Sequence, residues 1–409
     1  MKKNTKIVAT IGPASESKEK LREMAEAGMN VVRLNFSHGE YEWHETVINR
    51  VREVSEELKR PIAILADIQG PRIRTKVEAP FRVAKGDAVF VGDISAETEF
   101  PKTRGHWFFL DQPNIVHDIG VDDLILVEDG LLQFRVMKKE GNVLELEAIN
   151  DGEVKNRKGV NLPDSKLRLP VITEKDARDI RFVVGHGVDY VGLSFVGNAE
   201  DIRSARTLMA GEGIAESALP KIVAKIERKE AIKNLNEIVH EADAVMVARG
   251  DLGIELPETR VAILQKEIIA ASLSAVRPVI VATQMMKSMT ENPRPTRAEV
   301  SDVTNAVIDH ADAVMLSEES AMGKYPVETI RTMSEIIANT EESPFDNVYQ
   351  TIGMNLRSEY ATMVRSVYEL AKSYDAEIIL LVSESGFTAR LMSHFRPDSR
   401  LFVATNNQR

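Results

Sequence analysis

Eight short apolar runs constrain the fold of this chain more than any other feature of its sequence. They are rich in Val and Ile, and Gly, Pro or polar residues bound them, which is typical of strands buried on both faces of a parallel sheet. Stretches with helical periodicity lie between most of them. Eight strands, each followed by a helix, are what a (β/α)8 barrel needs. The runs begin at Lys6, Asn30, Pro61, Tyr190, Lys221, Ala244, Pro278 and Ala313.

The alternation of strand and helix breaks once, after the third run. From residue 71 to about residue 163 we find no convincing helix, only short alternating pieces with turn signals, such as FRVAKGDAVFVGD and NVLELEAINDG. We therefore predict a catalytic α/β barrel over residues 1–70 and 164–341. A β-rich lid domain, residues 71–163, is inserted after the third barrel strand on the active-site side.

The pattern changes again after Glu341. A helix over 359–373, a strand over 377–382, a further helix and a strand over 401–404 predict a C-terminal α/β domain over 342–409. The parallel sheet of this domain is barely begun and would leave an open edge. We therefore expect the chain to be a truncated product with an incomplete third domain.

Charge and cysteine content exclude several classes of function. A formal net charge of −11 argues against binding to nucleic acids or anionic membranes, because both require a broad positive field. The absence of cysteine excludes disulfide scaffolds and Cys-based zinc sites. The apolar run in the N-terminal MKKNTKIVATIGP is too short for a signal peptide, and no segment approaches a membrane span. We expect a cytoplasmic protein.

Polar residues concentrate at the C-terminal ends of the predicted barrel strands, where barrel enzymes place their active sites. Strand alternation puts Arg33, Asn35 and Ser37 on one face of the second run. It also puts Lys225 and Glu227 on one face of the fifth run. The same rim receives polar residues that end or follow other strands: Asp67, Asp251, Thr283, Ser317 and Glu319.

This ring of charges suggests a type of chemistry. Two carboxylates beside a lysine suit a hard cation such as Mg²⁺, which prefers oxygen ligands. Arg33, Arg74 and Lys225 supply fixed positive charge for a phosphoryl group during its transfer. Backbone N–H groups of the GDLG turn, which begins at Gly250, can hold a carboxylate or a phosphate. By itself, the pattern predicts metal-assisted chemistry on an anionic substrate.

Seven motifs, in order, resemble the signature set of the pyruvate kinases. The resemblance runs continuously over about residues 5–330 and continues into part of the C-terminal domain. It implies phosphoryl transfer from phosphoenolpyruvate to ADP, a requirement for Mg²⁺ or Mn²⁺, and assembly as a homotetramer. The motifs are TKIVATIGPAS, NVVRLNFSHG, GPRIRT, KIVAKIERKEAI, VARGDLGIE, ATQMMKSM with NPRPTRAEV, and LSEESAMGKYP.

The family pattern implies roles for the residues at the centre of the site. Glu227 and Asp251 would ligate the divalent cation. Lys225 would stabilise the transferring phosphoryl group and the enolate oxygen left behind, while Arg33 contacts the phosphate. The N–H groups of Gly250 and Asp251 would hold the substrate carboxylate.

The resemblance also implies the roles of the surrounding residues. Thr283, Ser317 and Glu319 would line the face where the enolate gains its proton, through water. Lys158, in RKGVNLP, would arrive when the lid closes and excludes water. The residues assigned to the nucleotide side are Asn35, His38, Arg74 and Lys158.

Several of these residues have a structural alternative. Asp251 is an N-cap in the alternative view, and Thr283 a packed strand residue. His38 is alternatively a capping or surface histidine. Arg249 is equally well explained by substrate support or by a structural ion pair. Glu227 has the alternative of serving only as the partner of Lys225.

The chain departs from the family at its monovalent-cation site. The positions that match a K⁺ site are Asn35, Ser37, Asp67 and Ile68, and Ile68 can offer only its carbonyl. K⁺-requiring members carry Glu where this chain has Arg72, and members with Lys there resemble K⁺-independent enzymes. Because Arg is permanently charged, we predict that Arg72 replaces the monovalent cation and that K⁺ is not required.

Two further functions stay open alongside pyruvate kinase activity. One is a non-catalytic paralogue that binds the metabolite to regulate a partner, against which the presence of Lys225, Glu227 and Asp251 argues. The other is a barrel enzyme that acts on a phosphoenolpyruvate-like acid without nucleotide, against which GPRIRT and the lid argue. The segment SESGFTAR, from Ser383, resembles the loop that holds an effector phosphate in regulated members; the alternative is a simple helix cap.

Overall fold

A closed barrel of eight parallel strands forms the centre of the computed structural model, which describes residues 3–97, 105–349 and 359–406. Neighbours around the barrel follow chain order, and the last strand pairs with the first. All eight predicted runs contain a barrel strand, so the predicted fold class is confirmed. The strands are β1 (Lys6–Thr10), β2 (Val31–Asn35), β3 (Ala63–Asp67), β13 (Tyr190–Leu193), β14 (Lys221–Ile226), β15 (Ala244–Ala248), β16 (Val279–Ala282) and β17 (Ala313–Leu316).

Both faces of each barrel strand are buried, which explains why the runs are almost continuously apolar. Side chains that point inward, such as Val8, Val223 and Met315, fill the barrel interior. Side chains that point outward, such as Ile7 and Val245, pack against the surrounding helices in the largest core cluster. With the interior filled by side chains, the strand ends are the places where polar groups can gather.

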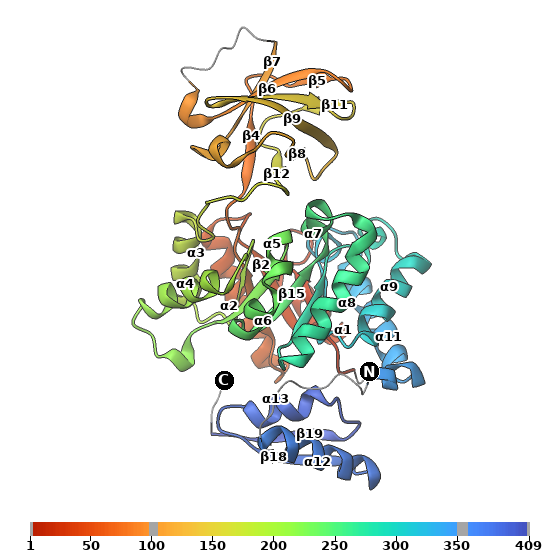
Figure 1. Cartoon of the computed structure of the whole chain (residues 1–409). Coiled ribbons are helices and arrows are strands. Elements are labelled where there is room, and N and C mark those ends of the chain that lie inside the picture. The colour runs from red at the N-terminus through yellow and green to blue at the C-terminus, as the bar shows by residue number, and fades with distance from the viewer. Residues whose placement is uncertain (1–2, 98–104, 350–358, 407–409) are drawn as a thin grey trace.

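Helices surround the barrel on its outer side (Figure 1). Several begin at the capping residues that the sequence supplies: the Thr173 side chain and Asp176 form a capping box at the start of α3, and Thr296 with Glu299 does so at α9. The α-helices are α1 (Lys18–Ala27), α2 (Tyr41–Glu57), α3 (Glu174–Gly185), α4 (Ala199–Ala210), α5 (Lys229–Lys233), α6 (Leu235–Glu241), α7 (Arg249–Glu255), α8 (Glu258–Ser274), α9 (Arg297–Ile308), α10 (Glu318–Ala321) and α11 (Pro326–Glu341). Three short 3₁₀ helices lie in the connections: η3 (Glu216–Ala218) before β14, η4 (Lys287–Thr290) after β16 and η5 (Pro344–Tyr349) after α11.

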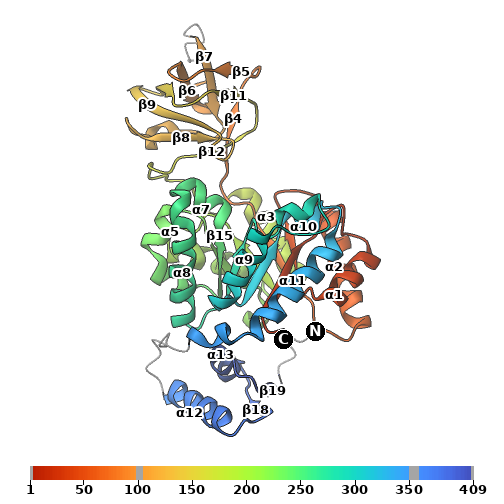
Figure 2. The same ribbon diagram turned by 90° about the vertical axis from the view of Figure 1, so that its right-hand side faces the viewer.

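The insertion after β3 forms a second, smaller closed barrel of seven strands, with an additional two-stranded sheet of β5 and β11. Figures 1 and 2 show this lid beyond the C-terminal ends of the eight parallel strands. Within residues 71–97 and 105–163 the only helices are two 3₁₀ turns, η1 (Ile94–Ala96) and η2 (Ile115–Asp118). The lid strands are β4 (Ile73–Lys76), β5 (Phe81–Val83), β6 (Ala88–Asp93), β7 (His106–Leu110), β8 (Leu124–Val127), β9 (Leu132–Glu140), β10 (Val143–Ala148), β11 (Gly152–Val154) and β12 (Gly159–Asn161).

The C-terminal domain lies at the opposite end of the barrel from the lid (Figures 1 and 2). It consists of α12 (Glu359–Ser373), β18 (Ile378–Val382), α13 (Phe387–His394) and β19 (Arg400–Ala404). The two strands pair in parallel, and the helices cover one face of the sheet. The other face is open, with Leu380 71% and Val382 81% exposed. The domain boundaries and the truncation stay predictions.

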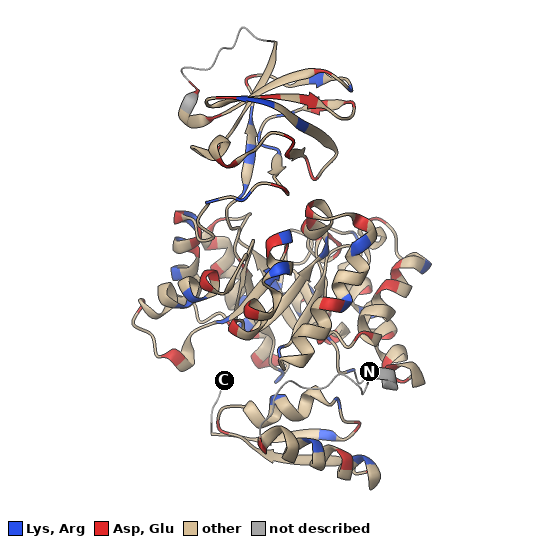
Figure 3. Ribbon diagram, viewed as in Figure 1, with Lys and Arg blue, Asp and Glu red and all other residues tan. Residues whose placement is uncertain are grey.

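Charged residues of both signs are interspersed over the outer helices and the lid, as Figure 3 shows. The formal net charge of −11 therefore reflects an excess of acidic residues that is spread over the surface with basic residues among them. In the ranges that the structure describes, no helix is both long enough and apolar enough to span a bilayer.

Two histidines, His310 of the barrel domain and His394 of the C-terminal domain, lead us to expect a loss of stability in acid. Burial and the charge of Arg396 lower the pKa of both His310 and His394 to about 4. An unfolded histidine titrates near 6.5, so the unfolded chain binds more protons between these values, and the free energy of unfolding falls as the pH drops through this window. We expect the urea midpoint to be lower at pH 5 than at pH 7.

The double variant His310→Asn, His394→Gln provides the control for this expectation. Asn is chosen at position 310 because the backbone there has a φ of +63°, which Asn tolerates. The double variant should lose part of the difference between the two pH values. A pH dependence identical to that of the unmodified chain would contradict the assignment to these two imidazoles.

Candidate active site

A cavity of about 110 Å³ lies at the C-terminal ends of the barrel strands. Residues from β2, β3, β14, β15 and β17, from the segments that follow several strands and from the start of α7 line it, so the structure brings together most of the residues predicted from the sequence. Those that line the cavity are Arg33, Asn35, Ser37, His38, Asp67, Ile68, Arg72, Lys225, Glu227, Asp251, Thr283 and Ser317.

Lys225 is the central cation of this cavity and is almost completely buried. Its Nζ lies 2.8 Å from Glu227 Oε1 and 3.0 Å from Asp67 Oδ1, and it donates a hydrogen bond of 2.7 Å to Ser194 Oγ. Burial alone would lower the pKa of Lys225, but the adjacent carboxylates of Asp67 and Glu227 raise it above its ordinary value. The ammonium group is therefore charged at neutral pH.

Arg33 is fixed beside Lys225 by the same buried carboxylate. Its Nε donates to Asp67 Oδ2 over 2.7 Å, and its Nη1 donates to Thr10 Oγ1 over 2.8 Å. Burial would raise the pKa of Asp67, yet the charges of Lys225 and Arg33 hold it below its ordinary value. Asp67 thus aligns two cations along one wall of the cavity.

Glu227 and Asp251 bring two carboxylates to the same cavity, near enough to interact, with Glu227 directly beside Lys225. Glu227 accepts a hydrogen bond of 2.7 Å from the backbone N–H of Phe195. The pKa of Glu227 is raised to about 7, chiefly by burial; Lys225 opposes this shift, and the negative charge of Asp251 adds to it. A cation between the two carboxylates would relieve this repulsion.

The donor set fits a hard divalent cation. Both carboxylates offer oxygen ligands, and they face a cavity with room for oxygens of a substrate. In the described part of the chain, no three or more His, Cys, Asp or Glu residues form a ready-made metal cluster. A metal held here would therefore depend on Glu227, Asp251 and substrate oxygens together.

The GDLG segment forms a helix rather than the turn that the sequence indicated. It lies in the first turns of α7, directly after β15, and the residue that precedes the helix is Ala248, so Asp251 is not the N-cap. The backbone N–H of Gly250 donates to Thr283 Oγ1 over 2.9 Å. N–H groups in a first helical turn have no intrahelical acceptor, and their assignment to a substrate carboxylate stays a prediction.

Thr283 occupies a strained backbone conformation at the end of β16. Its φ is +70°, and Gln284 follows with a φ of +54°. This region is unfavourable for a β-branched residue and persists only where the surroundings enforce it. Arg249 does so here: its guanidinium donates to the Thr283 carbonyl and forms an ion pair of 2.7 Å with Asp302. The structure favours the structural role for Arg249.

This contact gives a prediction for Arg249→Lys. A lysine cannot bind Asp302 and the Thr283 carbonyl in the same fork geometry. We expect kcat to fall about tenfold, equivalent to about 1.4 kcal/mol, with little change in the KM for substrate, because Thr283 is displaced while the anion-binding cations remain. Steady-state kinetics check this, with Arg260→Lys, on the exposed side of α8, as the matched control. A purely thermal loss, with kcat unchanged in the folded enzyme, would contradict the positioning role.

Glu319 is buried behind the cavity and does not line it. Its carboxylate accepts hydrogen bonds from the backbone N–H of Ser317 over 2.7 Å and from that of Met286 over 3.2 Å. It thereby connects the segments that follow β16 and β17, and Ser317 alone of the pair reaches the cavity. The neighbouring Glu318 is exposed and lies 3.7 Å from Lys287.

Two of the residues assigned to the nucleotide lie on the lid, away from the cavity. Lys158 forms an ion pair of 2.6 Å with Glu128. The Arg74 guanidinium donates to the Arg157 carbonyl over 3.3 Å. Neither side chain lines the cavity, whereas Asn35 and His38 do.

The sequence reading missed two polar residues that the site uses. Thr10 holds Arg33, and Ser194 accepts a hydrogen bond from Lys225. Thr10 is the last residue of β1, and Ser194 directly follows β13. The rule that singled out the other rim residues, a polar side chain at a strand end, would have found both.

Comparisons with known proteins agree with this architecture. The family model "Pyruvate kinase, barrel domain" matches residues 2–330, and "Pyruvate kinase, alpha/beta domain" matches residues 361–409. The pyruvate kinase of Bacillus licheniformis is 41% identical over 415 residues, 99% of this chain and 69% of that protein. That of Agaricus bisporus is 40% identical over 416 residues, 99% of this chain and 77% of that protein. That of Naumovozyma castellii is 41% identical over 421 residues, 100% of this chain and 82% of that protein. The chain belongs to the pyruvate kinase family.

Proposed function

We propose that the cavity at the barrel rim transfers the phosphoryl group of phosphoenolpyruvate to ADP, giving pyruvate and ATP. Membership of the family makes this chain a phosphotransferase of glycolysis. The observation that carries the assignment of the site is the buried Lys225, held between Asp67 and Glu227 at distances of 3.0 and 2.8 Å. It provides a fixed positive charge beside carboxylates that suit a metal.

The family generally requires a divalent metal, and we propose Mg²⁺ or Mn²⁺ as the ion that Glu227 and Asp251 hold. When bound, this ion would neutralise oxygens of the phosphoryl group and the substrate carboxylate. The two carboxylates would orient the substrate through the ion, and the first-turn N–H groups of Gly250 and Asp251 would bind the substrate carboxylate directly. Gly250 would then share its N–H with Thr283 Oγ1 or give up that contact.

Lys225 and Arg33 would act on the phosphoryl group during its transfer. Asp67 already aligns both cations, so they need no reorganisation when negative charge moves from the attacking ADP oxygen, across the phosphoryl group, to the leaving enolate oxygen. Lys225 would also stabilise the enolate oxygen that remains. Thr283 and Ser317 also line the cavity. Beside them a water could deliver the proton that converts the enolate to pyruvate, and Glu319 would position Ser317.

The lid would complete the nucleotide side of the site, together with Asn35 and His38. Lys158 and Arg74 would reach the cavity by movement of the lid toward the barrel, and Lys158 would exchange Glu128 for a nucleotide phosphate. Such closure would exclude water that otherwise competes for the phosphoryl group. The residues near the two ends of the insertion, where the lid joins the barrel, would act as the hinge.

A coupled assay with lactate dehydrogenase tests this function. Purified chain should form pyruvate from phosphoenolpyruvate only when ADP and a divalent cation are both present. Turnover without ADP would favour a barrel enzyme that acts on the acid alone, and binding without turnover would favour a non-catalytic paralogue. We further propose a homotetramer in the cytoplasm, and size-exclusion chromatography of the active enzyme tests the oligomeric state.

Arg72 gives a prediction about monovalent cations. It lines the same cavity as Asn35, Ser37, Asp67 and Ile68, the positions that match a K⁺ site. Because its charge is permanent, we expect full initial rates in K⁺-free buffer, with tetramethylammonium as the counter-ion. Arg72→Glu should create a K⁺ requirement. Stimulation of the unmodified enzyme by K⁺ of roughly tenfold, about 1.4 kcal/mol, would refute the replacement.

A further inference from the structure

The segment that follows β2 brings His38 to the rim of the cavity, and this segment folds around one buried imidazole. The imidazole belongs to His44, near the start of α2, and it is only 1% exposed. The reaction proposed above assigns no role to His44. We call residues 36–39 the rim loop.

Three contacts connect the rim loop to the His44 ring. The ring of Phe36 stacks on it, with the ring centres 4.0 Å apart and the planes 4° from parallel. The Nε2 atom lies 3.0 Å from the backbone carbonyl oxygen of His38. Gly39 passes so close that a β-carbon at this position would lie 3.3 Å from Nε2, and its φ of +80° is a conformation that favours glycine. The rim loop is thus shaped to fit this one side chain.

The His38 carbonyl determines which form of His44 fits. Because a carbonyl oxygen only accepts hydrogen bonds, Nε2 carries the proton and donates to it. The other ring nitrogen, Nδ1, is buried and has no hydrogen-bond partner among the residues that the structure describes. Burial lowers the pKa of His44, although the His38 carbonyl and the charge of Asp179 oppose the shift. His44 is therefore a neutral imidazole at neutral pH, with one donor directed at the rim loop.

The beginning of the rim loop is fixed independently of the His44 donor. The Phe36 N–H donates to the Asp67 carbonyl over 2.9 Å, and the Phe36 carbonyl accepts from Lys175 Nζ over 2.7 Å. Lys175 on α3 is in turn paired with the buried Asp179 over 2.6 Å. Phe36 should therefore keep its place when the donor of His44 is removed.

The end of the rim loop depends on His44. Within the described ranges, the backbone of the exposed His38 forms two hydrogen bonds. Its N–H donates to the Asn35 carbonyl over 3.1 Å, a local contact that belongs to the turn itself. Its carbonyl accepts from His44 Nε2, which is the contact that connects His38 to the helix behind it. Loss of the His44 donor should release His38 while the barrel strand before it stays in place.

We propose that His44 is a positioning residue for the nucleotide, because it holds His38 in the orientation in which it faces ADP. This inference rests on the proposed function, which places His38 on the nucleotide side of the cavity. The cations on the phosphoryl side, Arg33 and Lys225, are held by Asp67 instead. His44 should therefore affect the binding of ADP and leave that of phosphoenolpyruvate unchanged.

Two substitutions separate the donor of His44 from its ring. His44→Phe keeps a flat ring that can stack on Phe36 but cannot donate to His38. His44→Gln loses the ring, but its amide nitrogen reaches the place of Nε2 and can donate. For His44→Phe we expect the KM for ADP to rise about tenfold, with kcat and the KM for phosphoenolpyruvate within about twofold of those of the unmodified enzyme. His44→Gln should recover most of the affinity for ADP.

Two further measurements on the full chain need no turnover. Titration calorimetry with Mg·ADP should give a Kd that is about tenfold higher for His44→Phe than for the unmodified chain. Hydrogen–deuterium exchange should be faster in residues 36–40 of His44→Phe, because the N–H of His38 is less protected when its carbonyl is released. In His44→Gln the exchange of this segment should stay close to that of the unmodified chain.

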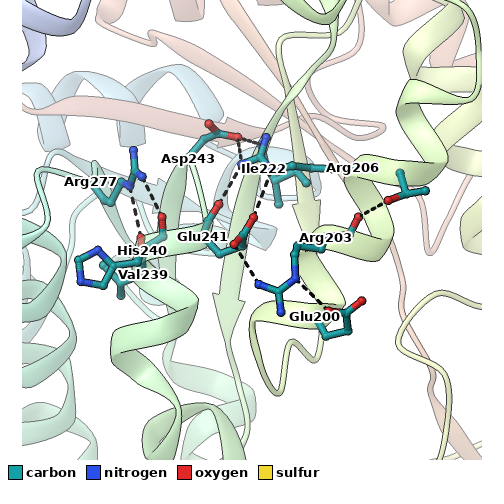
Figure 4. Close-up of polar contacts among 10 residues, drawn as sticks. Glu200, Arg203, Arg206, Ile222, Val239, His240, Glu241, Asp243 and Arg277 are labelled. Atoms are coloured by element: carbon teal, nitrogen blue, oxygen red, sulfur yellow. Dashed lines mark hydrogen bonds and ion pairs between the residues drawn. The ribbon is translucent and has the colours of Figure 1, made fainter.

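The same exchange of His for Phe at two other histidines provides matched controls. His186 belongs to the same aromatic cluster, but it stacks on Phe182, with ring centres 4.0 Å apart, and its Nδ1 lies 2.7 Å from the carbonyl of that residue. His240 is exposed at the end of α6, and Figure 4 shows that its carbonyl, rather than its ring, receives the guanidinium of Arg277. Neither His186→Phe nor His240→Phe should change the Kd for Mg·ADP or the exchange of residues 36–40.

The results distinguish this inference from the proposed function. Turnover without ADP, or no turnover, by the unmodified chain would contradict the proposed function, whereas Mg·ADP binding and exchange would still test His44. Equal affinities for Mg·ADP in the unmodified chain and in His44→Phe would overturn the inference, as would an unmodified chain that does not bind Mg·ADP. An equal rise of the KM for both substrates would also overturn it. If His44→Phe did not fold, a tenfold loss of affinity in folded His44→Gln, about the full effect expected for loss of the donor, would be decisive against it.

Discussion

Lys225→Met is expected to lower kcat about a thousandfold, at the upper end of what removal of one electrostatic group from a preorganised site costs. The methionine keeps most of the side-chain length but removes the charge that would face the phosphoryl group and the enolate oxygen. The KM for phosphoenolpyruvate should change much less, because Arg33 remains bound to Asp67. Steady-state kinetics at saturating metal check both values.

The same substitution should also destabilise the fold, since Lys225 compensates the buried Asp67 and Glu227. Leaving buried carboxylates without their partner costs about 3–5 kcal/mol. Lys221→Met, at the exposed start of the same strand, is the matched control and should affect neither kcat nor stability. If Lys225→Met, shown to be folded by circular dichroism, retained a tenth or more of the activity, the central role of this cation would be wrong.

Asp251→Asn is expected to weaken divalent-cation binding strongly and to lower kcat about a hundredfold at fixed Mg²⁺. The change removes one of the two carboxylates proposed to hold the metal, while the third carboxylate of the cavity, Asp67, is already paired with Lys225 and Arg33. Titration with Mn²⁺, followed by its effect on water proton relaxation, measures the affinity without turnover. Glu318→Gln, an exposed carboxylate beside the barrel mouth, is the matched control.

The pH dependence of metal binding provides a second measurement on the same variant. Because the pKa of Glu227 is raised to about 7 without metal, protons compete with the cation, and affinity should fall as the pH drops from 8 toward 6. Asp251 contributes to that raised pKa, so in Asp251→Asn the loss should shift to lower pH. An unchanged pH profile in the variant would show that Glu227 and Asp251 do not act on the same ion.

The eight barrel strands could be predicted because burial on both faces leaves an unambiguous pattern. The runs at Lys6 and Ala313 were predicted as the first and last strands, and the structure pairs Lys6 with Ala313 to close the barrel. The helix over Glu359–Ser373 was predicted to the residue. The closure of the lid into its own barrel could not be predicted, since alternating strands do not reveal which strand pairs with which.

The identity of the rim residues could be predicted, but their partners could not. A polar side chain at a strand end is visible in the sequence, as for Arg33 and Lys225. The contact of Arg249 with Asp302, and that of Glu319 with the N–H of Met286, depend on the packing of distant segments. The GDLG segment was wrongly predicted as a turn because two glycines usually interrupt a helix, whereas here they begin one.

The lid leaves the barrel and returns to it through paired strands, with Arg74 of β4 opposite Gly159 of β12. Because the two ends of the insertion are hydrogen-bonded to each other, the insertion should constrain the eight-stranded barrel no more than a short loop between β3 and the next helix would. Loop-closure entropy grows only slowly with length, so the scaffold tolerates such a module almost regardless of its size. Recombination could lengthen, shorten or exchange it between relatives without disturbing barrel closure, and the chemistry would be affected only through the side chains that the module carries to the rim.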